Sequence, residues 1–254
     1  MTTLVAPQRS ADVATPRRAL TARLAWLGVA LVALLLATTA SVAFGSRVVS
    51  LDEIVSAFTG AEDGVAQAAV LGRIPRTILA LLVGATLGLA GAVLQAVTRN
   101  PLADSQVLGI TSGASLFVVA GIAFVGLSSP MAYIWVAIAG SALAAILVYA
   151  IGSLGRGGPT PLKLALAGAV TSAAFNALVS AVLLPRIEVM DDFRFWQIGG
   201  VGGATYDKLT LVAPFLAVGT LICVVCARGL NALALGDDVA AGLGERVLRT
   251  RLAA

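Results

Sequence analysis

The residues that could perform chemistry are few in this 254-residue sequence, and their types do not make up a catalytic set. Histidine is absent, so the usual general base beside a nucleophile is missing. Cys223 and Cys226 are three residues apart, which places them on one face of a helix, as in a metal or redox pair. No other cysteine exists to complete a metal site. We therefore interpret both as small apolar residues, and we expect neither a metal nor a cofactor.

Nucleotide chemistry lacks its usual motif as well. A phosphate-binding loop ends in Gly-Lys-Ser/Thr, and the only two lysines here, Lys163 and Lys208, follow leucine and aspartate. The sequence therefore predicts no enzyme, and any work done against a gradient needs another subunit.

The polar stretch RNPLADSQVLGITSGAS (99–115) interrupts two long apolar runs. Arg99 suits the C-terminal end of a helix, where a cation complements the helix dipole. Pro101 disfavours helical backbone at Asn100 and should end that helix. Small residues before the turn should let a neighbouring helix approach closely; they are Gly84, Gly88 and Gly91. From the residues alone, this is a tight hairpin between two packed helices.

The elements around this stretch are long and apolar. Hydrophobic residues make up 59% of the chain and charged residues 12%, about half of what soluble domains carry. Four charge-free gaps have the length that a helix needs to cross a bilayer, and one gap of twice that length contains a turn-like break. We predict an all-α polytopic membrane protein with six spans, near 24–45, 77–98, 107–127, 131–151, 164–184 and 209–227.

The first span could instead be a secretory signal, but its apolar run is longer than the usual signal core. None of the six spans contains Asp, Glu, Lys, Arg or His, which disfavours a proton- or ion-coupled transporter.

The distribution of Lys and Arg predicts the orientation. With the N-terminus inside, the cytoplasmic segments carry eleven of the seventeen and the outer segments six. Both ends are then cytoplasmic, with a tail at 1–23, a membrane region at 24–227 and a cytoplasmic segment at 228–254, all in one transmembrane domain. The net charge of +4 follows from this topology, and we expect no nucleic-acid partner.

Four segments carry a resemblance to a known family. RIPRTILALLVGATLGLAGAVLQAVTRNPLADSQVLGITSGAS (73–115), LKLALAGAV (162–170), FWQIGGVGGATYD (195–207) and LNALALGDDVAAGLGERVLRTR (230–251) occur in the family's order. They resemble the FecCD-type permeases of ATP-driven (ABC) importers for iron-siderophores, haem and vitamin B12. The resemblance covers the chain from about residue 47 onward. It implies roughly ten spans in a full-length relative, whose internal repeats build the pathway. The chain then looks truncated at its C-terminus, either as a fragment or as a natural product.

The resemblance assigns roles to several residues. Arg73 and Arg76 would dock the substrate-binding protein at the outer face, although interfacial anchoring by their long stems is an alternative. The coupling segment (230–251) would seat in a groove of the ATPase, where the alternative is a surface helix on the inner leaflet. Its contact residues would be Leu233, Leu235, Gly236, Asp237, Asp238, Val239, Ala240, Leu243 and Gly244.

A cytoplasmic gate is the third implied site. Asn100 and Leu102 match one gate-forming turn of the family, and Pro161 and Leu162 match the other. At the second turn the sequence departs from its relatives, which often carry small hydroxyl residues. For both pairs, ordinary turn chemistry is the alternative.

The resemblance also implies the system in which the chain would act. It would be the permease of a bacterial plasma-membrane importer for a metal chelate, with a ferric siderophore expected and haem or vitamin B12 as alternatives. Its partners would be ATPase subunits, an extracytoplasmic binding protein, the lipid bilayer and a second permease in a homo- or heterodimer. The rival interpretation is a truncated chain that binds ATPase subunits without transporting.

Overall fold

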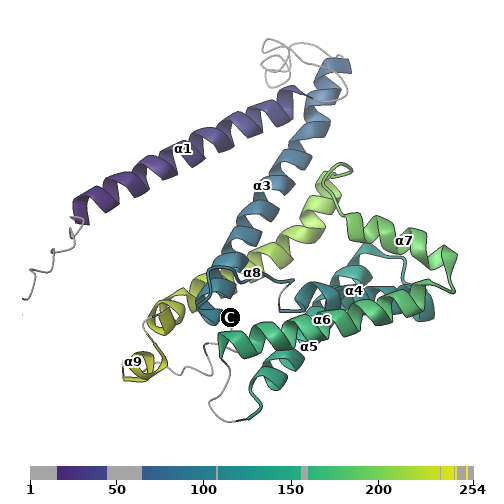
Figure 1. The fold of residues 1–254 in the computed structure, drawn as a ribbon. Helices are drawn as coiled ribbons and strands as arrows, with labels where there is room; N and C mark the ends of the chain where they lie inside the picture. The colour runs from purple at the N-terminus through teal and green to yellow at the C-terminus, as the bar shows by residue number, and fades with distance from the viewer. Residues whose placement is uncertain are drawn as a thin grey trace, which may run out of the picture. The chain divides into compact units, whose positions relative to one another are not determined.

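The computed structural model describes residues 16–44, 65–106, 108–155, 160–234, 236–242, 244 and 250. All regular structure within these ranges is helical, as the ribbon in Figure 1 shows. The elements are α1 (Pro16–Ala43), α3 (Val65–Thr98), α4 (Ile110–Ala120), the π-helix η1 (Gly121–Val125), α5 (Pro130–Gly152), α6 (Pro161–Leu183), α7 (Ile187–Ile198), α8 (Tyr206–Ala234) and α9 (Asp237–Gly242). The predicted all-α class is confirmed.

Five helices are long and apolar enough to cross a membrane: α1, α3, α5, α6 and α8. The remaining predicted span, 107–127, which is the third along the chain, is a shorter apolar helix over Ile110–Val125. At a rise of about 1.5 Å per residue it measures about 24 Å, less than the roughly 30 Å of a hydrocarbon core. It starts late because turns occupy residues 101–102, 105–106 and 108–109, and it ends early because Gly126 is left-handed, with φ 69°.

One helix boundary differs clearly from the prediction. We expected the second span to begin at residue 77, after the charged pair Arg73 and Arg76, but α3 begins at Val65. Pro75 lies inside α3, and the helix continues through it. The boundary was misplaced because a cation limits the apolar span without ending the helix that carries it.

The chain divides into two compact units, residues 1–77 and 78–254, and each is described by itself. In the first unit, no residue in the apolar span of α1 is buried. Its threonines satisfy their hydroxyls within the helix; Thr38 donates to the carbonyls of Leu34 and Leu35 at 3.0 and 2.9 Å. A polar group without water must find such an internal partner, so α1 is suited to contact lipid.

The core of the second unit is a three-helix packing of α4, α5 and α6 (Figure 1). Gly113 on α4 and Gly140 on α5 meet so closely that a Cβ on Gly113 would lie 2.6 Å from the Gly140 carbonyl oxygen. Small residues thus let the two backbones touch. The close approach predicted at Gly84, Gly88 and Gly91 is not made by the described part of the chain, where a Cβ at each would meet nothing within 4 Å.

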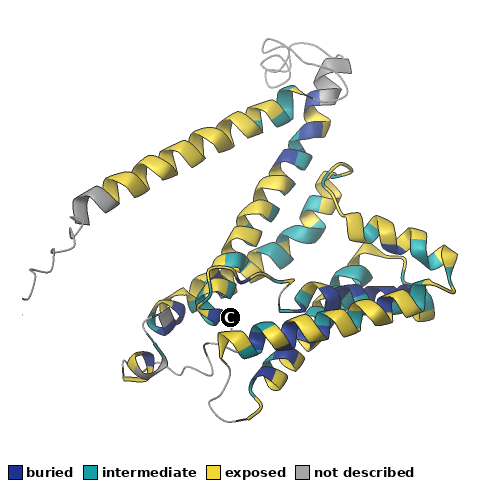
Figure 2. Ribbon diagram, viewed as in Figure 1, coloured by how far each residue is buried: buried dark blue, intermediate teal, exposed yellow. Residues whose placement is uncertain are grey.

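Buried residues concentrate on α4, as Figure 2 shows. Val118, Val119 and Ile122 form a cluster with Val179 of α6 and Phe193 of α7. Phe193 is 2% exposed and stacks on Trp196, with ring centroids 5.8 Å apart. The helix α7, which the charge pattern did not distinguish from a loop, is therefore packed on the core through one aromatic face.

Candidate functional site

The C-terminal end of α3 is closed by a helix-capping turn with an arginine in an unusual backbone conformation. Arg99 has φ 50°, the left-handed region in which a residue with a Cβ is disfavoured. The Arg99 amide donates to the Ala96 carbonyl at 3.4 Å, and the Asn100 amide donates to the Gln95 carbonyl at 3.2 Å. This pair of bonds is the Schellman motif, in which glycine usually takes the position of Arg99.

The turn that follows contains the first predicted gate pair. The Asn100 side-chain oxygen accepts a hydrogen bond from the Leu102 amide at 3.0 Å, which fixes the turn locally. The Leu102 side chain is 82% exposed, so a large apolar group projects from this turn with little cover from the described residues. An exposed leucine on a rigid turn is compatible with a gate, and ordinary turn chemistry accounts for Asn100.

The root of the coupling segment is folded against the end of α3. Leu230 and Leu233 of α8, Val93 of α3 and Ala240 of α9 form one buried cluster, in which Leu233 is 1% exposed and Ala240 is fully buried. Val239, one residue away on α9, is 49% exposed. Among the predicted coupling residues, Leu233 and Ala240 therefore hold α9 in place, and Val239 faces outward.

Two glycines bound α9, the short helix of the coupling segment. Gly236 has φ 117° and Gly244 has φ 84°, both in the region that favours glycine. The Ala240 amide donates to the Gly236 carbonyl at 2.9 Å, so α9 starts directly at the first glycine. Asp237 and Asp238 form its first turn, as predicted, while Leu235 and Leu243 lie outside the described residues.

The end of α3 and the end of α8 are joined by a hydrogen bond that sequence reasoning did not anticipate. Arg99 Nε donates to the Leu233 carbonyl oxygen at 2.9 Å, across 134 residues of sequence. The same carbonyl accepts the Gly236 amide at 3.1 Å. The sequence indicated a cation at a helix end but could not identify a second helix end beside it.

The second predicted gate pair lies at the start of α6. Thr160 caps this helix, its hydroxyl accepting from the Lys163 amide at 3.4 Å, and Pro161 takes the first helical position. Pro161 and Leu162 are both exposed. The two pairs thus belong to different elements, and α6 meets the segment after Asn100 through Ser172, whose hydroxyl donates to the Gln106 carbonyl at 3.3 Å.

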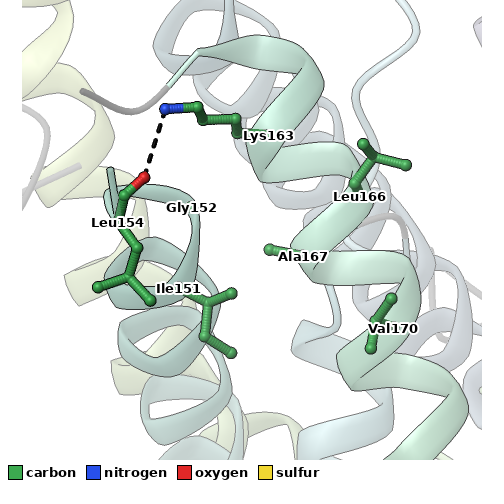
Figure 3. Close-up of a pocket in the computed structure, with 7 residues that line it drawn as sticks. All are labelled: Ile151, Gly152, Leu154, Lys163, Leu166, Ala167 and Val170. Carbon is green, nitrogen blue, oxygen red and sulfur yellow. Dashed lines mark hydrogen bonds between the residues drawn. The ribbon is translucent and has the colours of Figure 1, made fainter. Parts of the chain in front are cut away.

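Beside this helix start is a shallow pocket of about 370 Å³. Figure 3 shows Lys163 extending from α6 to the Leu154 carbonyl, a contact of 3.3 Å. The remaining lining is Ile151, Gly152, Leu166, Ala167 and Val170, so the pocket is apolar apart from one cation. It offers no set of groups for bond chemistry.

The predicted docking arginines lie on α3 in the first unit. Arg73 is 6% exposed, and its Nη1 donates to the carbonyls of Val42 and Ala43 at 2.8 and 3.1 Å. A 2.8 Å hydrogen bond between the hydroxyls of Ser41 and Thr77 adds to this contact. Arg73 thus holds the C-terminal carbonyls of α1, where a cation complements the helix dipole, and Arg76 is half-buried nearby.

Metal-binding clusters are absent from the described ranges. Cys223 and Cys226 are free thiols that pack against the Leu230–Leu233 cluster. This packing matches their interpretation as small apolar residues.

Comparison with known proteins gives consistent matches. The sequence model described as the FecCD transport family matches residues 33–254. The chain is 41% identical over 216 residues to the Bacillus subtilis "Probable siderophore transport system permease protein YfiZ", covering 84% of this chain and 64% of that protein. It is 38% identical over 223 residues to the Escherichia coli "Ferric enterobactin transport system permease protein FepD", covering 87% of this chain and 67% of that one.

The fold matches a solved structure too. That structure shows an inward-facing conformation of a transporter assigned to the metal-chelate type of ABC transporters. The TM-score is 0.63 at 25% sequence identity, with 89% of this chain and 68% of the other covered. The chain therefore spans about two thirds of the length of the proteins it matches.

Proposed function

The chain belongs to the FecCD transport family, and from that premise we propose that it is the permease subunit of an ATP-driven importer for a metal chelate, with a ferric siderophore as cargo. The observation that carries the proposal is α9, a short helix set between two left-handed glycines and anchored by Ala240. A short helix that follows α8 and is packed against it can receive force from a partner. Names of the two relatives, which refer to siderophore transport and to ferric enterobactin, support this choice of cargo.

The chain does no bond chemistry in this proposal. ATP is hydrolysed on separate ATPase subunits, and nucleotide binding there shifts the permease between outward- and inward-open states. The coupling segment receives the motion through α9, and the turns at Asn100–Leu102 and Pro161–Leu162 close the inner end of the pathway. The membrane-length helices provide the walls of that pathway. Their apolar stretches at 77–98, 131–151, 164–184 and 209–227 contain no Asp, Glu, Lys or Arg that would trap a chelate.

The partners and the orientation follow from the same proposal. Both ends of this chain face the cytoplasm of a bacterial plasma membrane, which the excess of Lys and Arg on that side supports. A second permease, identical or homologous, pairs with this one across the pathway. An extracytoplasmic binding protein delivers the chelate and docks on the outer surface near Arg76.

The test of cargo and function is uptake by the source bacterium after deletion of the gene. We expect the loss of ferric-siderophore uptake and its restoration when the gene is reintroduced. Loss of haem or vitamin B12 uptake instead would correct the cargo, and unchanged uptake of all three would contradict the proposal. Overexpression of this 254-residue chain beside an intact importer tests the rival, because inhibition would indicate a chain that binds ATPase subunits without transporting.

The docking role of Arg76 can be tested by charge reversal. We expect Arg76→Glu to weaken binding-protein docking about tenfold at low salt, because charge complementarity controls encounter and orientation. Arg76→Lys keeps the charge and is the matched control, and the amount of permease in the membrane is measured for both. The double variant Arg73→Glu with Arg76→Glu is less informative, because Arg73 also donates to the carbonyls of Val42 and Ala43. Docking that stays unchanged in Arg76→Glu would leave Arg76 as an interfacial anchor.

A further inference from the structure

Arg99 occupies a backbone conformation that its own residue type disfavours. Left-handed backbone at a residue with a Cβ is retained where the surroundings over-determine it, and such positions often have a function. Glycine would close the same Schellman turn without this strain, so capping of α3 does not require an arginine. The side chain of Arg99 must therefore be considered separately from its backbone.

The side chain connects two helix ends. Arg99 is the first residue beyond α3, and its Nε lies 2.9 Å from the carbonyl of Leu233, the second-last residue of α8. Both helices present their negative ends here, so one guanidinium complements two dipoles. A hydrogen bond from a charged donor is stronger than one between neutral groups, and this one reaches a buried residue.

The hydrogen bond from Arg99 to Leu233 joins the two parts that must move in the proposed function, the Asn100–Leu102 turn and the coupling segment. On one side, Arg99 directly precedes Asn100 and the exposed Leu102. On the other, the Leu233 carbonyl also accepts the Gly236 amide at the start of the coupling segment. Leu233 also belongs to the buried cluster of Val93, Leu230, Leu233 and Ala240, which joins α3, α8 and α9.

We propose that Arg99 is a positioning residue that transmits displacement of the coupling segment to the Asn100–Leu102 turn. When the ATPase moves α9, the Leu233 carbonyl moves with it, and the guanidinium carries that displacement to the backbone of the turn. In this left-handed conformation the Arg99 side chain reaches α8 and donates to the Leu233 carbonyl. This inference rests on the proposed function, because it needs an ATPase that moves α9.

The test measures the accessibility of the Asn100–Leu102 turn directly, so the cargo need not be known. Leu102→Cys is introduced with Cys223→Ala and Cys226→Ala, in membranes that contain the protein as the cell produces it and its ATPase subunits. The maleimide-labelling rate at position 102 is then measured with and without ATP. We expect about a fivefold change or more with Arg99 present, the usual lower range of coupling between two sites. In Arg99→Gly the labelling rate should be about the same with and without ATP, while ATP hydrolysis continues.

The controls separate transmission from stability. Glycine suits the left-handed position, so Arg99→Gly should keep its thermal unfolding midpoint near that of the parent. Where glycine loosens the turn, Arg99→Asn serves instead, since asparagine also tolerates this conformation. Arg99→Lys keeps a cation at both helix ends without the guanidinium fork and should retain an intermediate change.

The outcomes distinguish the two claims. A full nucleotide-dependent change in both Arg99→Gly and Arg99→Asn would overturn the role of Arg99 and leave the proposed function intact. Absence of any change in the Arg99 parent would contradict ATP-driven motion of the turn, and the proposed function would fail together with the inference.

Discussion

Replacement of Gly236 and Gly244 by alanine together is expected to abolish transport while ATP hydrolysis continues. Both glycines have positive φ, at 117° and 84°, and alanine in such conformations costs about 1–3 kcal/mol at each site. The open space around both positions means that the cost comes from the backbone and not from a clash. The strain is relieved by a rotation that displaces α9 from the cluster around Leu233 and Ala240. The ATPase then moves without moving the permease.

Gly242 gives the matched control within the same six-residue helix. A Cβ at Gly242 would meet nothing within 4 Å, and no positive φ restricts the residue. Gly242→Ala should therefore strengthen α9 slightly, by about 1 kcal/mol of helix propensity, and keep transport coupled. The measurement is the number of chelates imported per ATP hydrolysed in proteoliposomes with the ATPase and binding protein. Equal ratios in the double variant and the parent would show that the glycines are not needed for coupling.

The second large effect is expected at the contact between α4 and α5. Gly140→Ala would place a Cβ 2.6 Å from the Gly113 carbonyl oxygen and 2.7 Å from the Phe117 Cβ. Neither obstacle is the flexible end of a side chain, so the two helices must separate. Overpacking of this kind costs about 1–3 kcal/mol, and separation of α4 from α5 also disturbs its packing on α6. We expect a marked fall in the thermal unfolding midpoint in detergent.

Gly88→Ala is the control for this prediction, because a Cβ at Gly88 would meet nothing within 4 Å in the described chain. It should leave the unfolding midpoint unchanged or raise it, since alanine favours helix over glycine by about 1 kcal/mol. If Gly140→Ala and Gly88→Ala unfolded at the same temperature, the close approach of α4 and α5 would not be limiting for stability.

The membrane-length helices could be predicted because charge is excluded from lipid. The gaps between Arg76 and Arg99 and between Lys163 and Arg186 coincide closely with the apolar parts of α3 and α6. The ends of the helices were predicted less accurately than their apolar parts, because a helix can continue through charged residues such as Arg73 and Arg76. Gly88 and Gly113 show a further limit. Small residues indicate a capacity for close packing, and only the fold determines which of them receive a partner.

The candidate site was predictable in its segments and not in its contacts. Resemblance to a family located the turn at Asn100 and the glycines that bound α9. The hydrogen bond from Arg99 to Leu233 depends on a backbone angle that arginine rarely adopts and on a residue 134 positions away. Neither local propensity nor periodicity contains that information. The burial of Arg73 could not be predicted for a similar reason: its partners are backbone carbonyls at the end of α1, about 30 residues away in the sequence.

The short helix formed by α4 and η1 bears on how the protein enters the membrane during synthesis. Ser112 and Ser115 are buried on α4, and its apolar length falls short of a full crossing. A segment of this kind gains little by moving into lipid alone, since serine and glycine add almost nothing to partitioning. Gly140 on α5 and the face of α6 around Ala167 supply the protein surroundings that lipid cannot. Integration of α4 should therefore be delayed until α5 and α6 have left the ribosome, with the three helices released to the bilayer as one group.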